Sequence, residues 1–71
     1  MFEVQTYTFL DGWINCWSEE VNGESHPLTF KTYTAALEEL TDFLAANHEA
    51  FTNGAVEEQY DPHDYRIMEI R

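Results

Sequence analysis

The sequence TYTAALEELTDFLAANHEAFTNG, residues 32–54, carries the one long helical pattern of this chain. Its apolar residues recur three and four positions apart, and they are Tyr33, Ala36, Leu37, Leu40, Phe43, Leu44 and Phe51. Thr32 precedes this run as a natural N-cap, and Asn53-Gly54 is a typical helix stop. The helix either continues to about residue 52 or breaks near Asn47-His48. We expect one helix, frayed in its last two turns.

The side of this predicted helix opposite its apolar residues is acidic. Glu38 and Asp42 lie one turn apart, about 6 Å along the axis, with Glu39 beside them and Glu49 about two turns further on. The segment contains no Lys or Arg, although pairs of opposite charge four residues apart are the usual way to stabilise an exposed helix. The pattern therefore indicates a negatively charged helix face.

The Asp11-Gly12 pair predicts a β-hairpin in the first third of the chain. Asp-Gly favours a two-residue turn, because both central positions need positive φ. Such a turn places Thr8 opposite Asn15, and both faces of the hairpin then carry apolar side chains. We expect one set to face the helix, namely Tyr7, Phe9, Ile14 and Cys16. Trp13 and Trp17 then lie on the outer face, although the opposite assignment is nearly as favourable.

The remaining segments predict two further strands and complete the fold. Asn22-Gly23 is a second turn signal, and residues 24–30 follow it as a short third strand antiparallel to the second, at an edge because Pro27 cannot donate to a ladder. Residues 65–70 alternate as a final strand, which we place beside the first strand and parallel to it through a right-handed crossover. We thus expect a single α+β domain over residues 1–71. Its element order is βββαβ, its sheet order is 4-1-2-3, and the helix packs on one face.

The composition is strongly acidic, yet it is that of a folded protein. Fourteen Asp and Glu face three Lys and Arg, for a formal charge of −11, while 44% of the residues are hydrophobic and 15% aromatic. This balance disfavours nucleic acid and anionic membranes as direct partners and favours a cationic one. The single Cys16 allows no internal disulfide, and the N-terminus resembles no signal peptide. We therefore expect a soluble, cytoplasmic protein.

Candidate catalytic and metal-binding residues each have a simpler structural explanation. Asp61-Pro62-His63-Asp64 matches no zinc or calcium spacing, and Asp-Pro is common in turns. Cys16, in the middle of a predicted strand, is most simply a small buried residue. Adjacent acids such as Glu57-Glu58 point in different directions and do not converge on one substrate atom. We expect no enzymatic activity, no cofactor and no metal site.

In its size, its charge and its Glu38/Glu39/Asp42/Glu49 face, the chain resembles small acidic inhibitors made by phages and mobile elements against restriction or CRISPR systems. Several of these inhibitors occupy the nucleic-acid-binding groove of their target. The resemblance implies a non-enzymatic interaction module that binds a basic surface of a larger protein. We expect the contact residues to be Glu38, Glu39, Asp42, Glu49, Glu57, Glu58 and Asp61, with Trp13, Trp17 and Tyr60 as aromatic anchors. The alternative is a small structural protein that forms a homodimer through the uncovered sheet face or the final strand.

Overall fold

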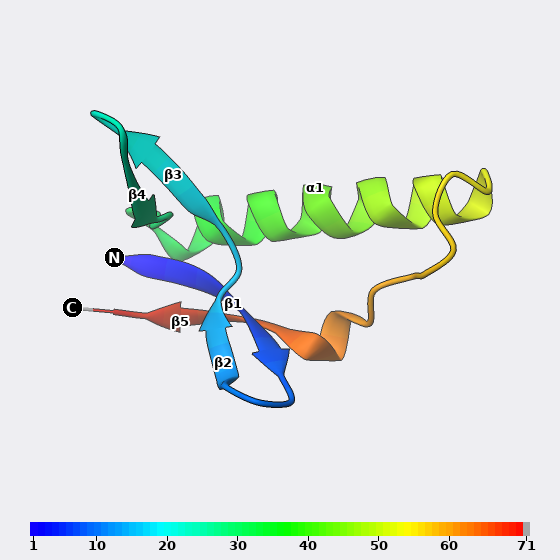
Figure 1. Cartoon of the computed structure of the whole chain (residues 1–71), viewed down its shortest axis with the longest axis horizontal. Helices are drawn as coiled ribbons and strands as arrows, with labels where there is room; N and C mark the ends of the chain where they lie inside the picture. Colours follow the sequence, from blue (N-terminus) through cyan, green and yellow to red (C-terminus); the bar gives the residue numbers. More distant parts are fainter. Residues whose placement is uncertain (71) are drawn as a thin grey trace.

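The computed structural model describes residues 1–70, which form two small antiparallel sheets and one long helix (Figure 1). The elements in chain order are β1 (Phe2–Thr8), β2 (Gly12–Asn15), β3 (Ser18–Val21), β4 (Glu24–Pro27), α1 (Tyr33–Thr52), the 3₁₀ turn η1 (Pro62–Asp64) and β5 (Tyr65–Glu69). A three-stranded sheet has the order β2-β1-β5, and β3 pairs only with β4. The expected α+β class is confirmed, whereas the strand layout differs from the expected one.

Helix α1 has the predicted ends. Thr32 is the N-cap, and its hydroxyl oxygen accepts a hydrogen bond of 3.1 Å from the backbone N–H of Ala35. The helix continues without a break through Asn47-His48 to Thr52, and the Asn53 N–H donates to the carbonyl oxygen of Glu49 at 3.0 Å. Local signals therefore determine both ends of this element.

The register of the first hairpin differs from the two-residue turn that Asp11-Gly12 predicts. Thr8 lies opposite Gly12 rather than Asn15. The Thr8 hydroxyl stabilises this longer loop, because it accepts from the Asp11 N–H at 3.1 Å and donates to the Gly12 carbonyl oxygen at 2.9 Å. Gly12 closes the loop at a φ of +71°, which a residue without a side chain adopts easily. The register is shifted by three residues, so the side chains that share a face are exchanged.

The exchange corrects the expected faces of the hairpin. Val4 is 1% exposed and packs with Ala36 and Leu40 of α1, so the even-numbered residues of β1 face the helix. The predicted inward positions of Tyr7 and Phe9 are therefore wrong, and these side chains are 51% and 93% exposed.

The two tryptophans lie on opposite sides of the sheet. Trp13, opposite Tyr7, lies on the outer face as predicted. The predicted outer position of Trp17 is wrong, because its ring packs edge-on against Phe43 of α1, with 5.4 Å between the ring centroids. The chain bends after β2, where the Asn15 side-chain oxygen accepts from the Trp17 N–H at 2.8 Å. This bend turns Trp17 toward the helix.

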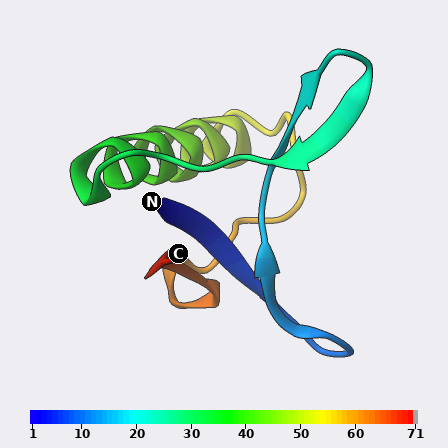
Figure 2. The same ribbon diagram turned by 90° about the vertical axis from the view of Figure 1, so that its left-hand side faces the viewer.

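The same bend separates the third strand from the main sheet. Asn22 and Gly23, at φ angles of +54° and +81°, form the predicted tight turn. The strand before this turn is no longer aligned with β2, and it pairs only with β4, from Ser18 opposite Pro27 to Val21 opposite Glu24. The β3–β4 hairpin stands beside the body of the molecule with all eight strand residues exposed (Figure 2).

Strand β5 is beside β1, as predicted, but it runs antiparallel to β1 instead of parallel. The segment after β4 returns to the start of β1, where Phe2 and Phe30 exchange backbone hydrogen bonds of 2.8 and 2.7 Å. Helix α1 therefore begins at the first end of β1 and runs along it to the other end (Figure 1). From that end, the only direction open to β5 is the return direction.

The core is thin for a chain of this length. Among residues 1–70, only Val4, Ala36 and Leu40 are buried, and they are surrounded by half-buried side chains: Phe2, Cys16, Trp17, Phe30, Phe43, Leu44, Tyr65 and Ile67. The accessible surface is 5466 Å², whereas a compact monomer of 8.3 kDa has about 4,600 Å². The radius of gyration is 13.2 Å, against about 11 Å for this length. The chain therefore exposes about 900 Å² more than a typical monomer.

Candidate acidic interaction surface

Three of the predicted carboxylates share one face of α1. At about 100° per residue, Glu38, Asp42 and Glu49 lie within about 40° of one another, on the side opposite the buried Leu40. All three side chains are exposed. We call these three residues the acidic face. Glu39 is also exposed, but it lies about 100° from Glu38, on the flank nearer to the β3–β4 hairpin.

The second group of predicted carboxylates is attached to the C-terminal half of α1 by Asn47. The Asn47 amide nitrogen donates to the Glu58 carbonyl oxygen at 3.3 Å, and its oxygen accepts from the Tyr60 N–H at 2.8 Å. The neighbouring Gln59 and His48 side chains are 2.7 Å apart. Glu57, Glu58 and Asp61 are exposed on the segment that these bonds hold. We call residues 57–61 the acidic segment.

Asn47 is the site residue that sequence reasoning missed. In the sequence it indicated only a possible helix break, whereas in the structure it is helical and half-buried. Its signal was the presence of one polar amide among the apolar positions of the helix, three residues after Leu44 and four before Phe51. A side chain with both a donor and an acceptor at such a position is suited to hold a passing backbone segment.

Asp61 has a defined local partner. It is the N-cap of η1, and its carboxylate accepts from the His63 N–H at 2.9 Å, with the His63 ring nitrogen Nδ1 3.1 Å away. The hydrogen bond from the His63 backbone is the main reason that the pKa of Asp61 is lowered from its ordinary value. Asp61 therefore keeps its charge under mildly acidic conditions.

The acidic face has no Lys or Arg partner among residues 1–70. Both ion pairs in this range use histidine, His26 with Glu24 and His63 with Asp61. Arg66 instead donates from Nε to the side-chain oxygen of Gln5 at 2.6 Å, and its guanidinium lies 4.4 Å from the centre of the Trp13 ring. The negative potential over α1 is therefore not compensated locally.

The predicted aromatic anchors occupy three different environments. Tyr60 is 41% exposed and stacks on Phe43 at 5.5 Å, next to the acidic segment. Trp13 is half-buried on the outer sheet face, where Arg66 covers it. Trp17 is half-buried against Phe43, so it is not a free anchor. Only Tyr60 lies beside the predicted carboxylates.

The tip of the first hairpin exposes two apolar residues that the sequence analysis did not consider as contacts. Phe9 and Leu10 are 93% and 89% exposed. A two-residue turn at Asp11-Gly12 would instead have placed both residues in a strand. The signal was present in Thr8, a residue whose hydroxyl often closes a loop by bonding to nearby backbone groups.

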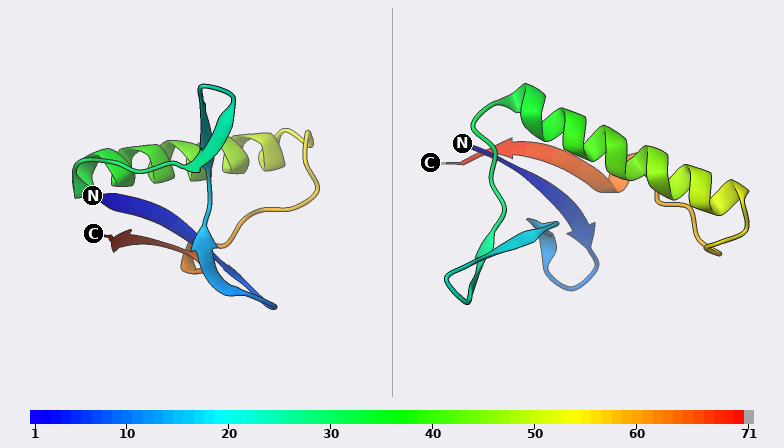
Figure 3. Two further views of the ribbon diagram at one scale, coloured as in Figure 1. Left: turned by 60° about the vertical axis from the view of Figure 1, so that its left-hand side comes forward. Right: turned by 90° about the horizontal axis from the view of Figure 1, so that it is seen from above.

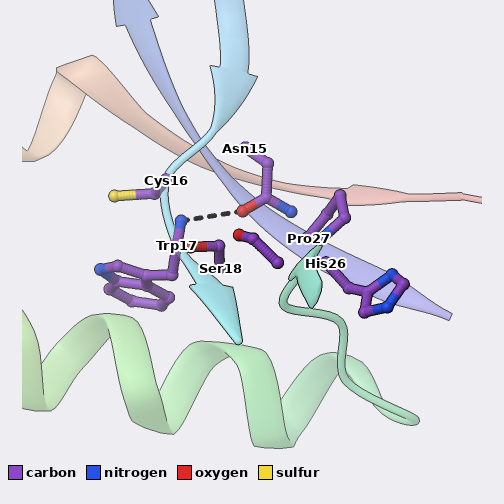
Figure 4. Close-up of a pocket in the computed structure, with 7 residues that line it drawn as sticks. Asn15, Cys16, Trp17, Ser18, His26 and Pro27 are labelled. Carbon is purple, nitrogen blue, oxygen red and sulfur yellow. Dashed lines mark hydrogen bonds between the residues drawn. The ribbon is translucent and has the colours of Figure 1, made fainter. Parts of the chain in front are cut away.

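An open pocket of about 390 Å³ lies between the end of β2 and the β3–β4 hairpin, and it is lined by Asn15, Cys16, Trp17, Ser18, Ser25, His26 and Pro27. Cys16 and His26 point to opposite sides of this pocket, so they do not form a nucleophile–base pair (Figure 4). Burial raises the pKa of the Cys16 thiol, which disfavours the reactive thiolate. Among residues 1–70, no three His, Cys, Asp or Glu side chains are grouped to hold a metal ion.

Comparison with known proteins finds no relative of this chain. No protein-family model matches it, and neither does any curated protein or solved structure. In the part of the chain that the structure describes, no helix is long and apolar enough to cross a membrane. The functional proposal therefore depends on the charge, exposure and geometry of the described residues.

Proposed function

We propose that this protein is a non-enzymatic interaction module whose acidic face and acidic segment bind a basic groove of a larger protein, one that otherwise binds nucleic acid. One observation carries the proposal: exposed carboxylates lie on and beside α1, and no Lys or Arg within residues 1–70 pairs with them. These carboxylates are Glu38, Glu39, Asp42, Glu49, Glu57, Glu58 and Asp61.

The charge density along α1 is close to that of a nucleic acid strand. Glu38 and Glu49 are eleven residues apart, which corresponds to about 17 Å of helix axis. This length carries four carboxylates, counting Glu39 and Asp42. A strand of duplex DNA presents about five phosphates over the same length. A groove that binds phosphates with Lys and Arg would therefore meet a similar number of negative groups.

The net charge exceeds what solubility alone requires. A small soluble domain usually carries a net charge of about 2–8 in magnitude, whereas this chain carries −11. Such an imbalance increases the repulsion within the folded protein and also accelerates association with a cationic surface. Tyr60 supplies an aromatic contact at the edge of the acidic segment, where apolar contact adds to attraction between charges.

The proposal is tested with a charge-reversed acidic face. The chain is immobilised, lysate proteins are captured at low salt, and duplex DNA is added as a competitor. The triple variant Glu38→Lys, Asp42→Lys and Glu49→Lys should lose the captured protein. A matched control reverses three exposed acids of the β3–β4 hairpin, Glu19, Glu20 and Glu24. This control has the same net charge and should retain binding.

Two results would overturn the proposal. Equal loss of binding in both triple variants would show that net charge, rather than the surface around α1, determines capture. A captured protein that duplex DNA does not displace would show that the bound surface is not a nucleic-acid-binding groove. The affinity of the chain for the captured protein should also fall steeply as salt is added.

A further inference from the structure

The outer edge of β5 presents backbone groups that have no partner among residues 1–70. β5 pairs only with β1, and the Ile70 N–H donates to the Met1 carbonyl oxygen at 2.8 Å. In an antiparallel ladder, alternate residues direct their N–H and C=O groups to the same neighbour. Tyr65, Ile67 and Glu69 therefore direct theirs away from β1. The Tyr65 N–H donates to the Pro62 carbonyl oxygen, so the outward N–H groups without a partner among residues 1–70 are those of Ile67 and Glu69. The strand YRIME also lacks the Pro or Lys that commonly protects such an edge.

One flank of α1 carries no acidic residue, although the chain has fourteen. At about 100° per residue, this flank comprises Tyr33, Leu37, Thr41, Leu44, His48 and Phe51, spaced three and four residues apart. Tyr33, Leu37 and Phe51 are 51%, 43% and 40% exposed. We call these six residues the acid-free flank. It is the side of an amphipathic helix that an isolated chain leaves partly uncovered.

The acid-free flank lies on the same side of the molecule as the free edge of β5. Phe43 lies on the other side of the buried residues Ala36 and Leu40 from this flank, and it contacts Trp17 beyond the end of β2. The sheet order β2-β1-β5 places β5 at the other end. Figures 2 and 3 show α1 and β5 together on the side away from the β3–β4 hairpin. The edge and the flank therefore lie on the same side of the molecule.

We infer that a second copy of this chain docks on this surface, so that β5 pairs antiparallel with β5 of the partner copy and the two acid-free flanks pack on each other. The product is one six-stranded sheet with two helices on the same face. The chain as a whole exposes about 900 Å² more than a typical monomer, and each partner buries roughly 800 Å² in an interface of standard size. A two-fold dimer uses the same surface twice, which is the commonest arrangement of soluble oligomers.

The side chains of β5 favour one register. Because Tyr65, Ile67 and Glu69 carry the outward backbone groups, centring the two-fold axis on Ile67 pairs Tyr65 with Glu69 and leaves Arg66 opposite Met68. No like charges are then directly opposite. Centring the axis on Arg66 instead would place two guanidinium groups against each other, which is unfavourable.

The helix spacing in this dimer also fits. α1 packs on both β1 and β5, so each helix lies over one pair of strands. In the six-stranded sheet, the line midway between β1 and β5 of one copy is two strand spacings, about 10 Å, from the same line in the other copy. Packed helices in proteins lie about 8–10 Å apart. Pairing at the β5 edge therefore brings the acid-free flanks to contact distance, while both acidic faces remain exposed.

The inference is tested by the molar mass in solution, measured by sedimentation at rising concentration in buffer with physiological salt. The wild-type chain should have twice its monomer mass of 8.3 kDa. Glu69→Pro removes one outward N–H and keeps the ladder to β1, so it should halve the measured mass. Glu69→Ala is the matched control, because it removes the same charge and keeps the N–H.

A second pair of variants examines the helix flank. Leu37→Arg places a charge on the acid-free flank and should give a monomer. Ala46→Arg makes the same change in net charge at an exposed position on the far side of α1, about 180° from Leu37, and should remain dimeric. Both variants lower the net negative charge, so a monomer cannot be attributed to increased repulsion.

Backbone hydrogen exchange of the wild-type chain tests the dimer without any substitution, so it does not depend on whether a variant folds. The amides of Ile67 and Glu69 should become protected together as the mass doubles. A chain that stays monomeric at millimolar concentration would overturn the inference. A dimer in which these two amides exchange freely, or one that survives in folded Glu69→Pro, would refute edge pairing.

Discussion

Replacing Leu40 with Ala should remove most of the stability of this fold. Leu40 is 8% exposed and is one of the three buried residues in the described part of the chain. A buried Leu→Ala change costs roughly 2–5 kcal/mol, because transfer free energy is lost and a cavity remains. A core of this size supplies only about 3–5 kcal/mol. We expect a loss of about 3 kcal/mol in the free energy of unfolding, which leaves the variant close to unfolded.

The matched control is the same change at Leu37, three residues earlier on the same helix. Leu37 is 43% exposed, so its truncation should cost about 1 kcal/mol. Urea unfolding followed by circular dichroism at low protein concentration measures both, with added sulfate to restore folding where Leu40→Ala is unfolded in buffer. Equal losses at the two positions, or a loss below about 1 kcal/mol at Leu40, would refute the assignment of the core.

Three further predictions concern charge and the acidic segment. Added sodium chloride should raise the melting temperature, because it screens repulsion among the carboxylates; a decrease would show that attractive pairs dominate. Asn47→Ala should speed hydrogen exchange at the Tyr60 amide, whose partner it removes, whereas Asn47→Asp keeps the acceptor and should preserve protection. Asp61→Asn should lower the melting temperature at neutral pH but not at a pH below the folded pKa of Asp61, because a pKa lowered by folding stabilises the protein only while the carboxylate is charged; an equal decrease at both pH values would contradict this.

The elements that local chemistry determines were predictable from the sequence. The Thr32 hydroxyl, the helical spacing that follows it and the Asn22-Gly23 turn each act over a few residues, and the structure contains all three. The Asp11-Gly12 turn was predicted wrongly for a local reason as well. The hydroxyl of Thr8 closes a longer loop, and the resulting shift in register placed Tyr7 on the outer face. The bend after β2 then turned Trp17 toward the helix.

The direction of β5 depended on contacts that no local pattern contains. Pairing of Phe2 with Phe30 determines where α1 begins, and this determines where β5 can begin. The candidate site likewise has one part that a local pattern predicts and one part that depends on distant contacts. Exposure of Glu38, Asp42 and Glu49 follows from helical periodicity. The attachment of the acidic segment to Asn47 joins residues 11 and 13 positions apart, so it required the folded chain.

The proposed dimer and the proposed groove-binding function use different sides of α1, and this difference makes them separable. The acidic face lies roughly 120° around the helix from the acid-free flank, so a partner bound to Glu38, Asp42 and Glu49 leaves the β5 edge free. Pairing two copies would place both acidic faces on one side of a six-stranded sheet and double the number of carboxylates that a groove can meet. If both proposals hold, Glu69→Pro should still bind the captured protein but with lower affinity and a shallower dependence on salt, because fewer charges take part. Binding that is unchanged in a monomeric variant would show that a single acidic face is sufficient, and that the dimer serves a separate purpose.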